Sequence, residues 1–312
     1  MTALPVILDC DPGIDDAVSL LVALASPENF NILGITTVAG NVDLDTCTRN
    51  ACQVRELAGR MDVPVYAGCP RPMVIEPVFA DHIHGDSGLG RAQLPEPSHM
   101  TEDQHAVDFI IETLLAADDN SITLVPTGPL TNIAVAITRS PEILPKIKQL
   151  IIMGGARSEG GNITPSAEFN IAADPHAAHV VYRCGRPILA MGLDATMQFR
   201  ASPARMDVLR GIDSETGRAV MAMLEHVNDV YVDFYGEEGA AIHDPCTIGY
   251  LLAPELFTTR PCAIAVEMSS PLTLGHTAVN LRVPDPDTSI EWVTQTDASA
   301  LFDLIVERLK RL

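Results

Sequence analysis

The sequence predicts an α/β fold, in which an open, mostly parallel central sheet is flanked by helices. Short apolar runs alternate with longer segments that carry apolar residues at helical spacing, an arrangement typical of parallel strands joined by helices. The 312 residues and the 47% hydrophobic content suffice for a large buried core. No internal repeat or linker divides the chain, so we expect a single domain over residues 1–312.

The first strand and the first helix form the clearest pair. Residues 4–9 are a short apolar run, and residues 15–25, after a Pro-Gly turn, carry Ala17, Leu20, Leu21 and Leu24 at helical spacing. The same pairing recurs along the chain. We expect further strands at 32–38, 122–125, 150–153 and 187–191, and further helices at 45–58, 130–138 and 175–183.

The remaining segments have weaker patterns. Residues 68–100 are rich in Pro and Gly and predict a long loop that can hold a short helix; loops of that length in compact domains are usually functional or disordered. Two helices are expected between residues 202 and 234. Apolar runs near Ile264, Val279 and Ile290 precede a last helix at 298–310, and Trp292 is expected in the core.

The charge balance excludes several classes of partner. The chain has 20 Lys and Arg residues against 41 Asp and Glu residues, a formal charge of −21, which repels nucleic acid and anionic membrane surfaces. The longest uncharged run near the N-terminus, residues 17–27, is about half a bilayer span and follows no cationic stretch. We therefore expect a cytoplasmic protein that binds neither nucleic acid nor membranes.

The seven cysteines are scattered, odd in number and without a C-x-x-C pair. This pattern fits neither a disulfide framework nor a zinc cage. We interpret the cysteines as reduced, mostly buried thiols without a catalytic role.

The strongest chemical signal is a cluster of four acids, Asp9, Asp11, Asp15 and Asp16, where the first strand ends and the first helix begins. In an open parallel sheet, ligands bind at the carboxyl ends of the strands. Helix capping explains one or two of these acids but not four. Crowded carboxylates repel one another unless they are compensated, and a hard divalent cation is the usual compensation. The cluster therefore predicts a metal site.

Other acidic motifs fit less well. A calcium-binding EF-hand loop that began at Asp9 would need Gly and Glu where this chain has Ile14 and Leu20. Zinc normally draws on His or Cys ligands. A Mg²⁺-dependent phosphatase with an aspartyl nucleophile also places D-x-D after a first strand, but no Lys lies near this cluster.

The run Asp9-Cys10-Asp11-Pro12-Gly13-Ile14-Asp15-Asp16-Ala17 resembles the N-terminal signature of the nucleoside hydrolases. Further segments resemble that family in the same order, at residues 38–41, 83–88, 126–132, 153–155, 161–170 and 243–245. The chain from residue 261 onward resembles it only loosely. The resemblance implies a Rossmann-like nucleoside hydrolase fold, Ca²⁺ as cofactor, a ribonucleoside substrate with a purine or pyrimidine base, and a homo-oligomer, either dimer or tetramer.

The resemblance also implies roles for individual residues. The calcium ligands would be Asp11, Asp15, Asp16, Asp244 and the carbonyl of Thr127, with Asp11 also acting as the general base. The remaining predicted residues would contact substrate. They are Asn41, Asn162, Glu168, Phe169 and Asn170 at the sugar, His243 as the acid that protonates the departing base, and His84, Tyr231 and Tyr235 near that base.

Several alternatives stay open at this stage. Asn41, Asn162 and Asn170 also suit turns, Tyr231 and Tyr235 have ordinary core spacing, and Asp9 suits a structural role as well as a supporting one. A catalytically silent protein that binds nucleosides or ribose would keep the same metal cage. The presence of both Asp11 and His243 favours an enzyme.

Overall fold

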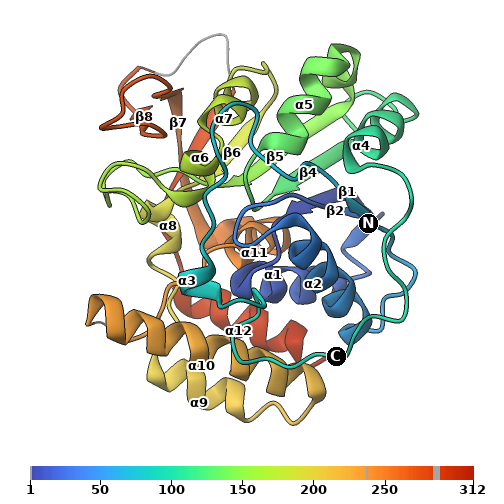
Figure 1. Ribbon diagram of the computed structural model, residues 1–312, viewed down its shortest axis with the longest axis vertical. Coiled ribbons are helices and arrows are strands. Elements are labelled where there is room, and N and C mark those ends of the chain that lie inside the picture. The colour runs from blue at the N-terminus through green and yellow to red at the C-terminus, as the bar shows by residue number, and fades with distance from the viewer. Residues whose placement is uncertain (1, 237, 284–288) are drawn as a thin grey trace.

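The computed structural model describes residues 2–236, 238–283 and 289–312, without the side chains of 234 and 235. Its centre is a nine-stranded sheet with strand order β3-β2-β1-β4-β5-β6-β9-β7-β8 (Figure 1). The strands are β1 Leu4–Cys10, β2 Phe30–Thr37, β3 Val65–Ala67, β4 Ile122–Pro126, β5 Ile147–Met153, β6 Ile188–Met191, β7 Phe257–Val266, β8 Thr277–Asn280 and β9 Ile290–Thr296. In this order, all neighbouring strands from β3 to β9 pair in parallel. Strand β7 is antiparallel to both of its neighbours, β9 and β8. The predicted α/β class is confirmed.

Helices cover both faces of the sheet (Figure 1). One buried apolar cluster packs α1, α2, α9, α10, α11 and α12 beneath the sheet, and a second packs α4, α5 and α7 on the other face. The helices are α1 Ile14–Leu24, α2 Leu44–Leu57, α3 Asp81–His84, α4 Ala106–Leu115, α5 Thr131–Arg139, α6 Phe169–Ala173, α7 Pro175–Tyr182, α8 Leu193–Thr196, α9 Pro203–Arg210, α10 Glu215–Tyr235, α11 Pro245–Leu252 and α12 Ala298–Leu309, with 3₁₀ turns at Pro141–Lys146 and Pro254–Leu256.

Most predicted elements are present within a few residues of their expected ends. The long loop after β3 contains one short helix, α3, and two helices, α9 and α10, lie where two were expected. Trp292 is fully buried, and the seven cysteines are free thiols, five of them buried. Among the described residues, no helix combines the length and the apolar character needed to cross a membrane.

Strand β3 and helices α4, α6, α8 and α11 were not predicted from the sequence. Strand β3 has only three residues, which is too short for a periodic signal. Helix α4 begins after His105, whose ring Nδ1 accepts the backbone N–H of Val107 at 3.2 Å. Because histidine is not among the residues that usually cap a helix, the start of α4 is hard to recognise in the sequence.

The parallel register brings the ends of the central strands to one edge of the sheet. Asp9 in β1 lies opposite Thr36 in β2 and Pro126 in β4. The residues that follow these three strands therefore begin side by side, although they are far apart in the sequence. They include Asp11, Asn41 and Thr127.

Candidate active site

A pocket opens at the carboxyl ends of the parallel strands. Its walls come from the first turn of α1, from α3 and α10, and from the segments that follow β2, β4 and β5 or precede α11. Eleven of the predicted site residues line it: Asp15, Asn41, His84, Thr127, Asn162, Glu168, Phe169, Asn170, Tyr231, His243 and Asp244. Asp11 and Asp16 lie behind this wall, where both are bonded to Asn41.

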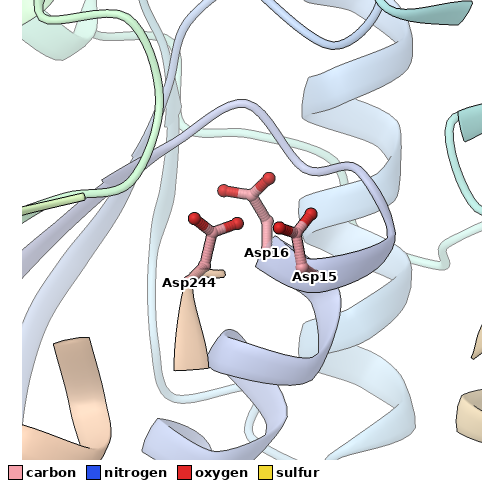
Figure 2. A group of neighbouring side chains, drawn as sticks. All are labelled: Asp15, Asp16 and Asp244. Atoms are coloured by element: carbon pink, nitrogen blue, oxygen red, sulfur yellow. The ribbon is translucent and has the colours of Figure 1, made fainter. Parts of the chain in front are cut away.

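Three carboxylates meet beside the pocket: Asp15 and Asp244 line it, and Asp16 lies behind them. Each of Asp15, Asp16 and Asp244 offers an oxygen, and these atoms all lie within 4.8 Å of one another. Figure 2 shows their carboxyl groups gathered between the start of α1 and the start of α11. The backbone geometry explains this meeting, because the Ser19 hydroxyl in α1 donates to the carbonyl of Asp244 at 3.2 Å.

Helix capping accounts for only part of this cluster. The Asp16 carboxylate accepts the backbone N–H of Gly13 at 3.2 Å, which closes the first turn of α1. It also accepts the Thr127 hydroxyl at 2.8 Å and the Asn41 side-chain amide at 3.0 Å. Asp16 therefore joins the first helix to the segments that follow β2 and β4.

Asp11 stands apart from the group of three. One of its carboxylate oxygens accepts the backbone N–H of Asn41 at 2.8 Å, and the other, Oδ1, is buried without a hydrogen-bond partner. Two glycines let the backbone approach this carboxylate, since a Cβ on Gly40 or Gly128 would lie 2.1 Å or 2.5 Å from its oxygens. An unpartnered buried carboxylate oxygen is costly unless something compensates it.

Burial makes these carboxylates hard to ionise. It raises the pKa of Asp11 and Asp244 well above the usual range, with the charge of Asp16 adding to the effect at Asp11 and that of Asp15 at Asp244. Burial, followed by the charge of Asp15, raises the pKa of Asp16 to about 7. A cation among these oxygens would reverse the shifts, because it favours the charged form of each group.

The atoms of this cluster that could bind a metal ion are oxygens. Besides the carboxylates they include the carbonyl of Thr127, which accepts the side-chain amide of Asn170 at 2.6 Å. Oxygen donors suit a hard cation such as Ca²⁺ or Mg²⁺. The orphaned Oδ1 of Asp11 and the three converging carboxylates therefore fit a divalent metal.

Asp9 lies one layer below the pocket and is fully buried. Its Oδ1 accepts the Thr36 hydroxyl at 2.6 Å and the side-chain amide of Asn132 at 2.8 Å. The same amide of Asn132 also donates to the carbonyl of Thr37 at 2.9 Å. Asp9 thus ties β1 to β2 and α5, which supports its structural interpretation. Burial raises its pKa to about 6.

The segment 161–170 closes another wall of the pocket. Asn162 accepts the backbone N–H of Phe169 at 2.8 Å, and Glu168 caps α6 by accepting the N–H groups of Asn170 at 2.8 Å and Ile171 at 3.2 Å. Glu168 also accepts the N–H of Gly155 at 2.8 Å. These side chains shape the loop and also line the pocket, so their role in the turn does not exclude the predicted contacts with the sugar.

The two predicted histidines are held in different ways. His84 is buried, and its Nδ1 accepts the backbone N–H of Ile14 at 3.1 Å. This bond assigns the proton of the neutral ring to Nε2. His243 is half-buried; its Nδ1 lies 2.8 Å from the hydroxyl of Thr196, and its backbone N–H is 3.4 Å from a carboxylate oxygen of Asp15. Burial lowers the pKa of both rings.

Several pocket residues were not predicted. Leu224 and Val227 share one face of α10 with Tyr231, and Ile83, Ile242 and His82 are among the other residues that line the pocket. The spacing of three and four residues along α10 is a signal that could have identified Leu224 and Val227. The side chain of Tyr235 lies outside the described part of the chain, so its contact stays a prediction.

Comparisons with known proteins agree with this geometry. A family model described as inosine-uridine preferring nucleoside hydrolase matches residues 6–303. The chain is 38% identical to the inosine-uridine preferring nucleoside hydrolase of Crithidia fasciculata, over 98% of both chains. It is 40% identical to the pyrimidine-specific ribonucleoside hydrolase RihA of Shewanella sp. (strain MR-4), over 98% of this chain and 96% of that protein. The solved purine-preferring ribonucleoside hydrolase from Gardnerella vaginalis superposes with a TM-score of 0.91 at 32% identity, and the match covers 98% of each chain.

Proposed function

Because the chain belongs to the family of inosine-uridine preferring nucleoside hydrolases, we propose that its pocket hydrolyses the N-glycosidic bond of ribonucleosides with the help of a bound Ca²⁺ ion. The protein is a ribonucleoside N-ribosyl hydrolase; the metal and the role of each residue are what we propose. The observation that carries the proposal is the meeting of Asp15, Asp16 and Asp244 within 4.8 Å, with Asp15 and Asp244 on the wall of the pocket.

The calcium ligands would be Asp11, Asp15, Asp16, Asp244 and the carbonyl of Thr127. When bound, the ion supplies positive charge that compensates these carboxylates and attracts the hydroxyl oxygens of the ribose. Calcium is favoured over zinc because the donor set consists of oxygens. The raised pKa values of Asp11, Asp16 and Asp244 support a site that needs a cation.

Asp11 is the best candidate for the general base. Cleavage of the bond between ribose C1′ and the nucleobase passes through an oxocarbenium-like state, which water must attack. Of the two carboxylate oxygens of Asp11, one is bonded to the backbone of Asn41 and the other has no partner. That second oxygen can accept a proton from the attacking water.

The sugar would be bound by the polar side of the pocket. Asn41, Asn162, Glu168 and Asn170 offer amide and carboxylate groups, which suit hydroxyls because a hydroxyl both donates and accepts. Phe169, adjacent to Glu168, adds an apolar surface at the same wall. The nucleobase would lie toward Tyr231 and the apolar face of α10, and Tyr235 would extend that face.

Of the two histidines, His243 is the better candidate for the acid that protonates the departing base. The Nδ1 of His84 accepts a backbone N–H, so a second proton on that ring would break the bond to Ile14. A neutral imidazole can donate a hydrogen bond through Nε2–H but is no acid near neutral pH. Burial lowers the pKa of both rings, so the hydrogen bonds distinguish them. The Nδ1 of His243 faces the hydroxyl of Thr196, which can accept as well as donate, so a second proton on this ring breaks no hydrogen bond.

The experiment that tests the proposal is a panel of inosine, uridine, cytidine, adenosine and guanosine, each followed for free base and for ribose. We expect equal amounts of both products from at least one nucleoside. Binding without release would favour the silent nucleoside-binding alternative. Release of phosphate from p-nitrophenyl phosphate, without nucleoside cleavage, would favour the phosphatase. The panel also assigns the preference between purines and pyrimidines.

We further propose that residues 1–312 act as one domain in a homo-oligomer, in a cytoplasmic pathway of nucleoside salvage or catabolism. The continuous sheet supports the single domain. Exposed apolar side chains gather in the segment that precedes α3, at Met73, Val74, Val78 and Phe79, and such patches often mark contacts between proteins. Light scattering from the purified protein tests the assembly, and a monomeric mass would contradict it.

A further inference from the structure

Among the described residues, only the side chain of Thr196 forms a hydrogen bond with the ring of His243. Thr196 is fully buried at the end of α8. Its hydroxyl lies 2.8 Å from Nδ1 of His243 and 3.4 Å from the carbonyl of Gly192, one turn earlier in the helix. A threonine in a helix often donates its hydroxyl to such a carbonyl. We assign that direction here, which makes the hydroxyl of Thr196 an acceptor for the Nδ1–H of His243.

Helix α8 is held firmly against the end of the sheet. A Cβ on Gly192 would lie 2.2 Å from the indole ring of Trp292, so the start of the helix fits closely against β9. The Thr296 hydroxyl donates to the carbonyl of Ala195 at 3.1 Å, and the backbone N–H of Thr296 donates to Gln198 at 3.0 Å. The position of the Thr196 hydroxyl is therefore set by the packing of β9 and not by His243.

We propose that Thr196 is a positioning residue for His243. The Thr196 hydroxyl fixes the His243 ring through Nδ1, so that Nε2 and its proton face the nucleobase. The inference rests on the proposed function of His243. In the proton-transfer step, the bond between Nε2 and its hydrogen breaks, the proton goes to the departing base, and the N–H bond electrons remain on Nε2. Nδ1 keeps its hydrogen throughout, so the bond to Thr196 is the same before and after the step.

The test compares two substrates, because only one of them needs a proton on its leaving group. A nucleoside with a natural base needs this help, whereas p-nitrophenyl riboside departs without it. We expect Thr196→Val to lower kcat for the nucleoside by about 10-fold or more while KM changes by less than about twofold, with a smaller loss for p-nitrophenyl riboside. Thr196→Ser, which keeps the hydroxyl, should recover most of the lost activity.

A matched control is available on strand β9, which packs against α8. Thr296→Val removes another buried threonine hydroxyl that bonds to α8, but one that does not contact His243. It should leave the ratio of the two activities unchanged. If Thr196→Val does not fold, the comparison of Thr196→Ser with Thr196→Ala isolates the hydroxyl, and thermal unfolding of each variant reports on folding.

Each outcome decides the proposal. Equal losses on both substrates in Thr196→Val, or no loss at all, would contradict the positioning role of Thr196. His243→Ala is measured in parallel to separate this failure from a failure of the proposed function. If His243→Ala also loses both activities equally, His243 is not the acid and both proposals fall. If His243→Ala slows the natural nucleoside more than p-nitrophenyl riboside and Thr196→Val does not, only the proposed role of Thr196 is wrong.

Discussion

The four acids between residues 9 and 16 have different hydrogen-bond partners. Asp9 accepts hydrogen bonds from the side chains of a threonine and an asparagine, whereas Asp11 accepts one from a backbone N–H. Each of the two also has one buried oxygen without a hydrogen-bond partner, Oδ2 in Asp9 and Oδ1 in Asp11. Asp15 and Asp16 belong to the first turn of α1 and converge on Asp244. Residues of one type in one short segment therefore have different surroundings. These surroundings support the structural, basic and metal-binding roles that we propose for them, and the sequence alone does not show them.

The role of Asp11 as base is tested by Asp11→Asn, which keeps the size of the side chain and removes its basicity. We expect kcat to fall by at least about 10²-fold in the nucleoside assay. Asp9→Asn is the matched control, because Asp9 is an equally buried acid two residues earlier, in β1. A loss as large in Asp9→Asn, or near-normal turnover in Asp11→Asn, would place the base elsewhere.

A second prediction at this scale concerns His84. Because its ring accepts the N–H of Ile14, it can donate a hydrogen bond to substrate but no proton. His84→Ala should therefore lower kcat/KM by similar factors for natural nucleosides and for p-nitrophenyl riboside, whereas His243→Ala should affect the natural nucleosides far more. Steady-state kinetics of both variants on both substrates measure this. Selectivity in His84→Ala alone would exchange the two roles.

At the scale of elements, the sequence predicts what is local and misses what joins distant segments. The first strand, its acidic turn and α1 were predicted because their signals lie within a few residues of one another. The bond between His84 and Ile14 spans 70 positions, and that between Thr196 and His243 spans 47. No periodicity or spacing reveals such bonds, because they depend on the register of the sheet and on how α3 and α8 are oriented.

The same limit applies to the pocket. Its polar residues were expected from their resemblance to known motifs, but the apolar wall was not, because Leu224 and Val227 look like ordinary core positions of α10. Tertiary packing decides which element a segment contacts, and the apolar pattern of that segment's sequence does not. Strand β3 and helix α4 were missed for related reasons, one too short and the other without a usual cap.

Helix α12 depends on one acidic contact for part of its docking. Glu28, between α1 and β2, accepts Arg308 and Arg311 at 2.5 Å each. The bond from Arg311 is the largest cause that lowers the pKa of Glu28, to about 2. A carboxyl whose pKa is lower in the folded state stabilises the fold above its unfolded pKa, and this contribution is lost as the pH falls through the folded pKa.

We therefore expect Glu28→Gln to lower the free energy of unfolding at neutral pH by about 1 kcal/mol or less, since the side chain is exposed. The difference from the parent protein should narrow as the pH falls from about 4.5 toward 2. Urea unfolding at several pH values measures it. Glu307→Gln, which removes a partner of Arg311 alone, is the control and should have a smaller effect. If the difference in the free energy of unfolding stays constant with pH, ionisation of Glu28 does not contribute to the stability of the fold.

At the scale of the whole molecule, the carboxylate cluster joins an early and a late segment of the chain. Asp15 and Asp16 belong to the first helix, and Asp244 precedes α11, which packs in the same apolar cluster as α1 and the C-terminal helix α12. Three acids held within 4.8 Å repel one another unless a cation or protons compensate them. The proposed metal site is therefore also a point on which the stability of the fold depends.

Removal of the metal should consequently lower the stability of the entire domain and not only its activity. An ion that binds the folded state alone adds RT ln(1 + [Ca²⁺]/Kd) to the free energy of unfolding, about 2.7 kcal/mol at 100 times Kd. We expect chelation to lower Tm by several degrees and to abolish nucleoside cleavage, and added CaCl₂ to restore both. Asp244→Asn should respond less to calcium, because it lacks one of the three converging carboxylates. Metal analysis should find about one Ca²⁺ per chain. An unchanged Tm in protein shown to be stripped of metal, or zinc bound through cysteines, would exclude a calcium ion from the cluster.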